Sequence, residues 1–354
     1  MTGSRALAAF ATKMTSKYGE DRISNGPPPV IVPTGSAALD WALRVGGWQL
    51  GRVYEISGPK DSGKSTLAIA SIVEHLRMFP DRGAGYVNME NTFDPRRATA
   101  MGLDCSKRAT AEGRWFPMLP EHSEHVSDMA RDLVESGFVS IVVVDSIGAM
   151  ESDRTLGKTA DKAADAVGRN AKIITQMTKA LSTFARIKQC TVLLINQPRA
   201  NIGSMVGGDI SAGPKLIQHA TTSKIEMKAL GGEENVRTLK LPGENDPLVV
   251  SLKTRMRVTR LKNGLTGRVA ESYVNRVGTD EYGPPGIDTA DEYITLAMRE
   301  KIVTVGGTYY TLPDGTKIQG RIAFARYLRE NPAACEVIRK ALSFEAPTDP
   351  LEDD

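Results

Sequence analysis

The sequence has few cysteines, few aromatic residues and no long apolar run. Three cysteines occur among 354 residues, and aromatic side chains make up 6% of the chain. Cys105, Cys190 and Cys335 lack the short spacing of a metal site and the even number of a disulfide framework, which predicts reduced thiols and a cytoplasmic location. Because no apolar run reaches about 18 residues, we expect no membrane-spanning helix, and the N-terminus lacks the apolar stretch of a signal peptide.

A strong excess of charge of one sign is also absent. The formal net charge is +3, so the overall charge does not by itself predict a nucleic-acid partner. The 41% of hydrophobic residues suffices for a soluble protein with one large domain and a smaller one. A nucleic-acid site would therefore have to come from a local cluster of basic residues.

The sequence does contain a phosphate-binding loop, the P-loop. Residues 56–70 read ISGPKDSGKSTLAIA and match the pattern G-x-x-x-x-G-K-[ST], with a strand pattern before the loop and a helical pattern after it. Backbone N–H groups at such a helix N-terminus bind phosphate oxygens. Lys64 is expected to reach the β- and γ-phosphates, and Ser65 to ligate Mg²⁺. The residues expected to hold the nucleotide are Gly58, Pro59, Lys60, Asp61, Ser62, Gly63, Lys64, Ser65 and Thr66.

Strand and helix patterns alternate through the middle of the chain. After residue 51, four apolar runs are separated by helical segments, which predicts a mostly parallel sheet, and three further strand patterns predict an antiparallel extension. This alternation favours an α/β fold. A short amphipathic helix over 5–18 precedes a proline-rich linker and needs an apolar surface elsewhere. The expected divisions are an N-terminal helix and linker over 1–34, a core over 35–283, a small α/β C-terminal domain over 284–344 and an acidic, disordered tail over 345–354.

Three of the apolar strand patterns end in polar side chains. Asp145 ends IVVVD, and in a protein with a P-loop an acid at that place associates with Mg²⁺. Glu90 follows YVNM and is either a carboxylate that polarises an attacking water or a solvated charge. Asn196 and Gln197 end LLINQ, where a neutral amide either senses the γ-phosphate through a hydrogen bond or lies in an ordinary turn.

Two long loops, about residues 152–168 and 199–214, flank a helix with a basic stripe. Loops of this length in a compact fold tend to be functional, and both follow strands at the sheet edge where ligands bind in α/β folds. The stripe indicates either contacts with a DNA phosphate backbone or an ordinary solvated helix face. Aromatic residues are absent from both loops, so base-stacking platforms are not expected. The stripe consists of Arg169, Lys172, Gln176 and Lys179.

In their order and spacing, these motifs resemble the RecA family of DNA strand-exchange recombinases from about residue 5 to residue 344. The resemblance depends on PTGSAALDWAL, GRVYEISGPKDSGKSTL, MENTFDP, IVVVDSIGAM, LLINQPRANIG and IQGRIAFARYLRENP. The segment SAGPKL is more similar to phage-encoded, UvsX-type homologues. The resemblance implies a RecA-type P-loop ATPase core with ATP and Mg²⁺ as cofactors. It further implies helical filaments on single-stranded DNA, pairing with homologous double-stranded DNA, strand exchange in recombination and repair, and hydrolysis of ATP to ADP and phosphate that releases the DNA.

The resemblance also implies roles for single residues around the nucleotide. Glu90 activates the water, Gln197 links the γ-phosphate to the second DNA-binding loop, and Asp94 meets the adenine edge. Arg97 replaces an aromatic residue that the family often stacks on adenine, and a guanidinium plane can also stack on a base.

Contacts with the neighbouring subunit and with DNA are implied in the same way. The N-terminal helix docks on the adjacent subunit and so builds a filament. Lys262 reaches the neighbour's ATP. The family often has a second lysine two positions later, where this chain has Gly264, so Lys262 acts either alone or together with Arg260. The residues implied to bind DNA are Val167, Arg169, Lys172, Lys179, Arg199, Ile202 and Gly213. The basic residues among them contact phosphates, and the apolar side chains enter between bases.

The remaining expectations concern protein partners and two alternative functions of the same fold. A single-strand-binding protein and a loader are expected partners, with no membrane, in the host cytoplasm if the chain is phage-encoded. A hexameric DNA helicase on the same core is one alternative, and it would require a closed ring and lack this kind of C-terminal domain. A P-loop ATPase of the clock or signalling type is the other, and it would lack the basic helix between the two loops.

Overall fold

The computed structural model describes residues 2–19, 29–152, 160–197, 217, 220–240, 243, 246–261 and 266–342. The chain divides between residues 30 and 31 into two units. The first unit contains helix α1 (Thr2–Tyr18), which includes the helix predicted over 5–18. Leu7 is 71% exposed and Phe10 is 60% exposed on this helix, so large apolar side chains of α1 face solvent.

The second unit is built on a ten-stranded, mostly parallel sheet, which confirms the predicted α/β fold. The sheet order is β12-β11-β10-β8-β3-β7-β6-β4-β5, and β9 pairs with β10 outside this path. The segment TSKIEMKA, predicted within the antiparallel extension, is β8; it pairs parallel with β3 and antiparallel with β10, so it joins the two parts of the sheet. The strands are β3 (Val53–Ser57), β4 (Gly83–Asn88), β5 (Trp115–Met118), β6 (Val139–Asp145), β7 (Thr191–Asn196), β8 (Ser223–Ala229), β9 (Val236–Leu239), β10 (Leu248–Leu261), β11 (Val269–Asn275) and β12 (Gly286–Ile287).

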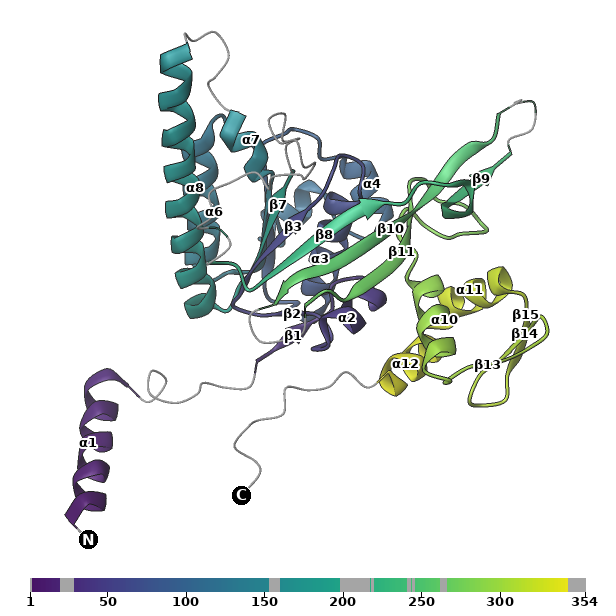
Figure 1. Cartoon of the computed structure of the whole chain (residues 1–354), viewed down its shortest axis with the longest axis horizontal. Helices are drawn as coiled ribbons and strands as arrows, with labels where there is room; N and C mark the ends of the chain where they lie inside the picture. The colour runs from purple at the N-terminus through teal and green to yellow at the C-terminus, as the bar shows by residue number, and fades with distance from the viewer. Residues whose placement is uncertain are drawn as a thin grey trace, which may run out of the picture. The chain divides into compact units, whose positions relative to one another are not determined.

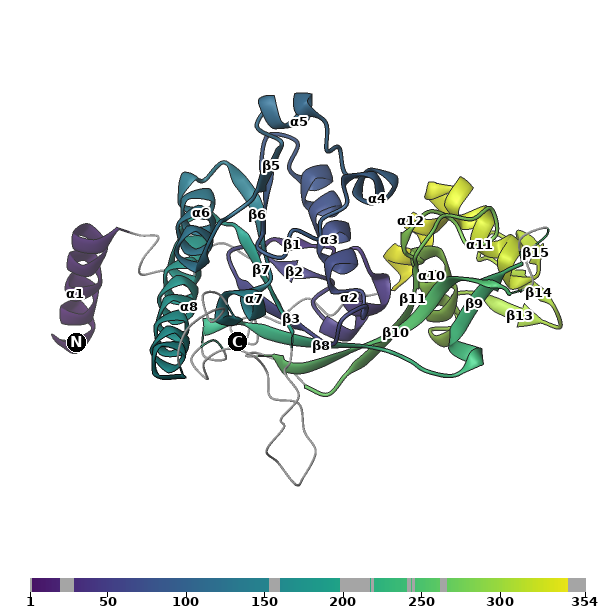
Figure 2. The ribbon, with the colours of Figure 1, turned by 90° about the horizontal axis from the view of Figure 1, so that it is seen from above.

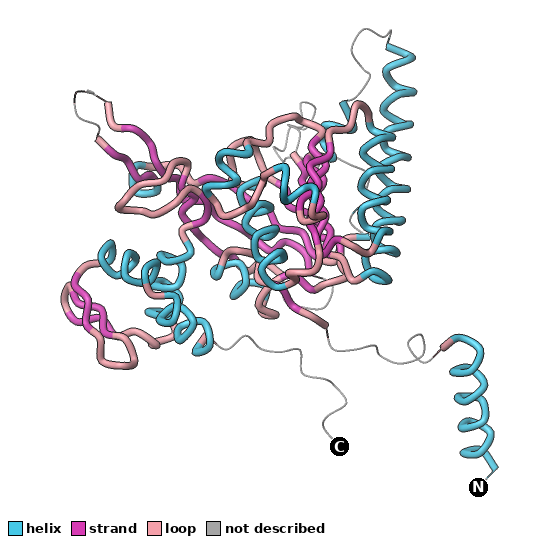
Figure 3. Tube along the Cα trace, turned by 180° about the vertical axis from the view of Figure 1, so that it is seen from behind, coloured by secondary structure: helices cyan, strands magenta, loops and turns pink. Residues whose placement is uncertain are grey.

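Helices cover both faces of this sheet because alternate strand residues point to opposite sides. Ile141 and Val143 of β6 belong to the apolar cluster formed with α2 and α3, whereas Val142 and Val144 belong to the cluster formed with α6 and α8. Figure 1 shows α6 and α8 side by side along one side of the sheet, and Figure 3 shows strands between layers of helices. The helices are α2 (Ala37–Leu43), α3 (Lys64–Met78), α4 (Pro95–Ala100), α5 (Lys107–Ala111), α6 (Ser123–Ser136), α7 (Ile147–Ser152) and α8 (Ala160–Lys188), and a small sheet pairs β1 (Ile31–Val32) with β2 (Trp48–Gln49).

Residues 289–342, which we term the C-terminal lobe, form most of an apolar cluster around Phe324, Leu328 and Ile338, to which Ala37 of α2 also belongs. This segment, predicted to be a small α/β domain, contains a hairpin of β13 and β14, and a third strand, β15, pairs with β14. Figure 2 shows the lobe beside β9 and β11, far from α8. The elements of the lobe are α10 (Thr289–Arg299), β13 (Thr304–Gly306), β14 (Tyr309–Thr311), β15 (Lys317–Gln319), α11 (Arg321–Glu330) and α12 (Pro332–Ala341).

The first predicted loop is shorter than expected. Helix α8 already begins at Ala160, so the prediction of a loop through residue 168 is wrong. The alanine-rich segment ADKAADA has a high intrinsic helix propensity, which the absence of apolar periodicity concealed. The second predicted loop, 199–214, lies outside the described residues. No helix in the described part of the chain is long and apolar enough to span a bilayer, and the three cysteines are unpaired.

Candidate nucleotide site and candidate DNA-binding helix

The predicted nucleotide residues gather around an open cavity of about 470 Å³. The cavity lies at the carboxyl ends of parallel strands, the edge where ligands bind in α/β sheets. Most of the P-loop, Glu90, Asp145 and Gln197 line it, although they come from distant parts of the sequence. Four predicted nucleotide residues are not among its lining residues: Gly58, Pro59, Ser62 and Asp94. The lining residues are Lys60, Asp61, Gly63, Lys64, Ser65, Thr66, Glu90, Thr92, Arg97, Asp145, Gln197, Leu252, Thr254, Val274 and Arg276.

The P-loop has the tight geometry that its glycines allow. A Cβ atom on Gly58 would lie 2.2 Å from the carbonyl oxygen of Met227, so no larger residue fits between β3 and β8. Gly63 has a φ of +90° directly before α3, in the left-handed region that glycine adopts at little cost. The Nζ atom of Lys64 donates to the carbonyl oxygen of Pro59 at 2.7 Å. Burial lowers the pKa of Lys64, and the charges of Asp145 and Glu90 oppose this shift. A buried lysine beside free helix N–H groups is suited to a phosphate oxygen.

Asp145 accepts two hydrogen bonds on one carboxylate oxygen. Ser65 Oγ donates to Asp145 Oδ2 at 2.8 Å, and the hydroxyl of Tyr86 donates to the same atom at 2.5 Å. Burial raises the pKa of Asp145, and these hydrogen bonds counteract the rise. The adjoining hydroxyl and carboxylate oxygens of Ser65 and Asp145 are hard donors that fit Mg²⁺. Tyr86 was not predicted from the sequence, since an aromatic residue in a buried strand gives no sign of a polar contact.

Glu90 is bound by two side chains from other strand ends. Gln197 Nε2 donates to Glu90 Oε1 at 2.8 Å and to Oε2 at 3.1 Å, and Ser146 Oγ donates to Glu90 Oε1. Glu90 follows β4, Ser146 follows β6 and Gln197 follows β7, so the sheet itself orients this carboxylate. Ser146 also escaped the sequence analysis, although its place next to Asp145 was an available signal.

Asp94 and Arg97 make contacts that differ from those expected with adenine. Asp94 Oδ1 accepts from the backbone amides of Arg96 at 2.9 Å and Arg97 at 3.3 Å, and so caps α4. The guanidinium of Arg97 donates to Thr66 Oγ1 and to the backbone at the end of β11. Protein groups therefore already accept hydrogen bonds from the edge of the Arg97 guanidinium. Stacking of its planar face on a base stays a prediction.

Two basic residues of β10 form ion pairs with an acid from the neighbouring strand. Lys253 Nζ lies 3.0 Å and Arg255 Nη2 lies 2.7 Å from carboxylate oxygens of Glu271 on β11. Nη1 of Arg260 is buried without a hydrogen-bond partner among the described residues, which leaves a donor for a group outside them. Lys262 itself lies outside the described residues.

The basic stripe on α8 is present on its exposed side. Lys172, Gln176 and Lys179 are exposed, whereas Ile174, Met177 and Leu181 are buried, as the pattern predicts. Arg169 is also exposed but forms an ion pair with Glu124 of α6. This pair partly neutralises Arg169, so the two lysines are the better candidates for phosphate contacts. Of the other predicted DNA-binding residues, Arg199, Ile202 and Gly213 lie outside the described residues, and the structure describes no side chain for Val167.

Comparison with known proteins agrees with this arrangement. The family model for the RecA N-terminal domain matches residues 14–264. The protein named RecA from Roseiflexus sp. (strain RS-1) is 29% identical over 354 residues, which cover 98% of this chain and 92% of the relative. RecA of Staphylococcus aureus (strain Newman) is 31% identical over 349 residues, 96% of this chain and 91% of the relative. RecA of Acinetobacter baylyi is 27% identical, covering 93% and 88%. The chain therefore belongs to the RecA family of homologous recombinases, DNA-dependent ATPases that use ATP and form filaments on DNA.

Proposed function

We propose that ATP binds in the 470 Å³ cavity and that Glu90 activates the water that attacks its γ-phosphate. The single observation that carries this proposal is the set of hydrogen bonds that Ser146 and Gln197 make to the Glu90 carboxylate. They fix a base at the carboxyl ends of the strands, beside the P-loop. A positioned carboxylate of this kind accelerates hydrolysis by general base catalysis.

The P-loop residues bind and orient the phosphates in this proposal. Lys64 exchanges its hydrogen bond with the Pro59 carbonyl for phosphate oxygens, and the first N–H groups of α3 bind the same chain of phosphates. Ser65 and Asp145 hold Mg²⁺, which supplies positive charge at the phosphates when bound. The hydroxyl of Tyr86 keeps the Asp145 carboxylate in place through its short hydrogen bond. Asp94 would meet the edge of the adenine, and the guanidinium plane of Arg97 would stack on it.

Gln197 connects the nucleotide to DNA in this account. Its amide either bonds Glu90, as in the structure, or turns toward the γ-phosphate, and residues 198–216 follow it directly. The segments at about 152–168, which runs into α8, and 199–214 hold single-stranded DNA in this proposal, with Lys172, Lys179 and Arg199 on phosphates and Val167 and Ile202 between bases. Such contacts do not depend on sequence, which suits a protein that coats any single strand.

Neighbouring subunits complete the ATP site in the proposed filament. The exposed apolar side chains of α1 support docking of residues 1–34 on an adjacent core, and the buried Nη1 of Arg260 supports a role for Arg260 with Lys262 at the next nucleotide. The division into an ATPase core over 35–283 and a small C-terminal domain over 284–344 is proposed because nearly all buried members of the third apolar cluster come from the lobe.

Three finer assignments remain part of the proposal. The segment SAGPKL favours a phage-type, UvsX-like member of the family, acting in the host cytoplasm. A protein that coats single strands competes with single-strand-binding proteins, so we expect such a protein and a loader as partners. A hexameric helicase on the same core is not favoured, because the relatives that match over nearly the whole chain are named RecA.

A strand-exchange assay tests the proposed function. Circular single-stranded DNA is mixed with linear duplex of the same sequence, ATP, Mg²⁺ and the full-length protein, and joint molecules are measured by gel electrophoresis. We expect joint molecules with the homologous duplex and none with an unrelated duplex. Unwinding of a forked duplex without need for homology would support a helicase instead.

A further inference from the structure

One short segment, Asn275–Arg276 at the end of β11, separates two cavities. Arg276 lines the nucleotide cavity. Asn275 lines a second cavity of about 550 Å³ between the core and the C-terminal lobe, together with Asp288 and Arg329. Because Asn275 is only 1% exposed, its position is fixed by the surrounding fold. This segment is therefore the boundary between the nucleotide site and the lobe.

On the nucleotide side, Arg97 binds this boundary and the P-loop at once. Its Nη1 donates to the carbonyl oxygen of Arg276 at 2.6 Å, and its Nη2 donates to the carbonyl oxygen of Asn275 at 3.3 Å. The same Nη2 donates to Thr66 Oγ1 at 3.1 Å. A guanidinium carries five N–H donors, and these three contacts do not use all of them. A nucleotide in the cavity can therefore bind Arg97 without displacing the backbone of β11.

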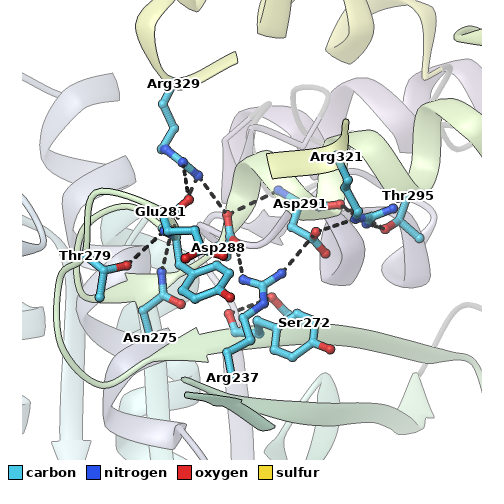
Figure 4. A network of polar contacts seen from close by, with 12 residues as sticks. Arg237, Ser272, Asn275, Thr279, Glu281, Asp288, Asp291, Thr295, Arg321 and Arg329 are labelled. Carbon is cyan, nitrogen blue, oxygen red and sulfur yellow. Dashed lines mark hydrogen bonds and ion pairs between the residues drawn. The ribbon is translucent and has the colours of Figure 1, made fainter. Parts of the chain in front are cut away.

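On the lobe side, Asn275 binds the turn that leads into α10. Its Nδ2 donates to the carbonyl oxygens of Tyr282 at 2.9 Å and Pro284 at 3.0 Å. Arg329 of α11 donates to the carbonyl oxygens of Glu281 at 2.9 Å and Tyr282 at 3.4 Å. The core and the lobe thus hold the same turn from opposite sides (Figure 4).

Glycine allows this turn to close on the lobe. Gly283 has a φ of +89°, and a Cβ atom there would lie 2.9 Å from Cδ of Arg329. Any other residue would both strain the backbone and push the arginine away. The contact between the turn and α11 therefore depends on close packing as well as on hydrogen bonds.

Arg237 of β9 fastens the start of α10 to the same region. Its guanidinium carbon lies 3.6 Å from the ring centroid of Tyr273, and its nitrogens lie 2.6 Å from Asp288 Oδ2 and 3.1 Å from Asp291 Oδ1. Arg321 of α11 pairs with Asp291 at 2.7 Å. The side chain of Arg237 is 14% exposed, so these ion pairs are largely shielded from water. Figure 4 shows that Arg237 of β9 and two arginines of α11 point toward the same pair of carboxylates. The arginines of α11 are Arg321 and Arg329, and the carboxylates are those of Asp288 and Asp291.

We propose that nucleotide binding controls how firmly the C-terminal lobe is held on the core, with Arg97 and Asn275 as the positioning residues. The inference rests on the proposed binding of ATP beside Arg97. A bound nucleotide fixes Arg97 through its remaining donors, Arg97 fixes the carbonyls of the boundary segment, and Asn275 fixes the turn that Arg329 also binds. Because binding free energies couple reciprocally, a loosened lobe must weaken nucleotide binding by the same factor.

Hydrogen–deuterium exchange of the full-length protein, with and without a slowly hydrolysed ATP analogue, tests this coupling. In the wild type we expect the analogue to slow backbone exchange over residues 279–300 about tenfold. With saturating analogue, Asn275→Ala should retain protection of the P-loop but lose most of the protection over 279–300. Arg97→Lys should bind the analogue more weakly and, at concentrations that protect its P-loop, should also lose most of the protection over 279–300. Arg96→Lys is the matched control, because Arg96 is an exposed arginine of the same helix, and it should respond like the wild type.

The outcomes separate the coupling from the nucleotide site. Protection of the P-loop without protection over 279–300 in the wild type overturns the coupling and leaves the ATP site intact. A normal response in both Arg97→Lys and Asn275→Ala also overturns it. Absence of P-loop protection in the wild type overturns the proposed ATP site and the coupling together. In the reciprocal direction, Arg237→Met should weaken analogue binding about tenfold, and unchanged affinity contradicts the proposal.

Discussion

The side-chain amide of Gln197 donates to both carboxylate oxygens of Glu90, at 2.8 and 3.1 Å. The two residues lie 107 positions apart in the sequence and meet because β4 and β7 end at the same edge of the sheet. An amide that turns toward a phosphate must release at least one of these bonds. The proposed water-activating carboxylate and the proposed phosphate sensor therefore cannot act independently.

Replacement of Glu90 tests the proposed base. Glu90→Gln keeps the volume of the side chain but removes its ability to accept a proton from water. We expect DNA-stimulated ATP turnover to fall roughly 10²- to 10⁴-fold, while an ATP analogue still binds. Steady-state hydrolysis with saturating single-stranded DNA measures the first quantity, and equilibrium titration measures the second. Turnover near the wild-type rate would show that another group activates the water.

Replacement of Gln197 tests the link between nucleotide and DNA. Gln197→Ala removes the only amide that connects Glu90 with the segment after β7 in the described part of the chain. We expect DNA affinity to become nearly the same with ADP and with the ATP analogue, whereas the wild type binds more tightly with the analogue. Gln319→Ala, on the exposed strand β15 of the lobe, is the control for general destabilisation. If Gln197→Ala keeps the wild-type ratio of affinities, the sensor is another residue.

The sequence sufficed to predict the α/β fold and most of the residues that line the 470 Å³ cavity, because their signals are local. The P-loop spacing, the apolar strands and the polar residues at the strand ends all lie within short segments. Tyr86 and Ser146 were missed, since their roles depend on which strands become neighbours in the sheet. The same holds for β8, whose parallel pairing with β3 depends on the whole sheet order.

Arg97 shows most clearly what a sequence pattern leaves open. Its position predicted a contact with the nucleotide, and it does line the cavity. Its hydrogen bonds to the end of β11, 178 and 179 residues further along the chain, follow only from the three-dimensional arrangement. The limit of the loop before α8 was also misjudged, because helix propensity without apolar periodicity is a weak signal.

His75 should make the fold sensitive to acid. It is fully buried in α3, neither ring nitrogen has a hydrogen-bond partner among the described residues, and burial lowers its pKa to about 3. An unfolded histidine has a pKa near 6.5, so the unfolded chain takes up the proton first as the pH falls. The contribution of neutral, buried His75 to the free energy of unfolding is complete above about pH 6.5. As the pH falls from about 6.5 to 3, this contribution is lost at about 1.4 kcal/mol per pH unit.

A comparison of variants isolates this contribution. From pH 7 to pH 5, we expect His75→Leu to lose about 2 kcal/mol less free energy of unfolding than the wild type in urea titrations. The comparison is needed because Glu292 acts in the opposite sense: burial raises its pKa to about 7, so its ionisation costs stability as the pH rises from about 4.5 to 7. His125→Ala serves as the control. Parallel losses in the wild type and in His75→Leu would show that His75 is not the cause.

The basic stripe of α8 predicts a defined salt response. Removing one cation that binds a phosphate of the single strand should reduce the slope of log affinity against log salt concentration by roughly 0.7. We expect this reduction for Lys172→Ala and none for Gln176→Ala, an uncharged change on the same exposed side of the helix. Fluorescence anisotropy of labelled single-stranded DNA across a salt series measures the slopes. An unchanged slope for Lys172→Ala would assign this side of α8 to solvent.

Assembly on DNA is the most direct test of the central claim, that ATP bound in this cavity drives cooperative coating of single-stranded DNA. The full-length protein is incubated with long single-stranded DNA and either a slowly hydrolysed ATP analogue or ADP, and is then viewed by negative-stain electron microscopy. The account predicts continuous helical filaments with the analogue and short or absent filaments with ADP. Closed rings, or filaments of equal length with both nucleotides, would contradict it.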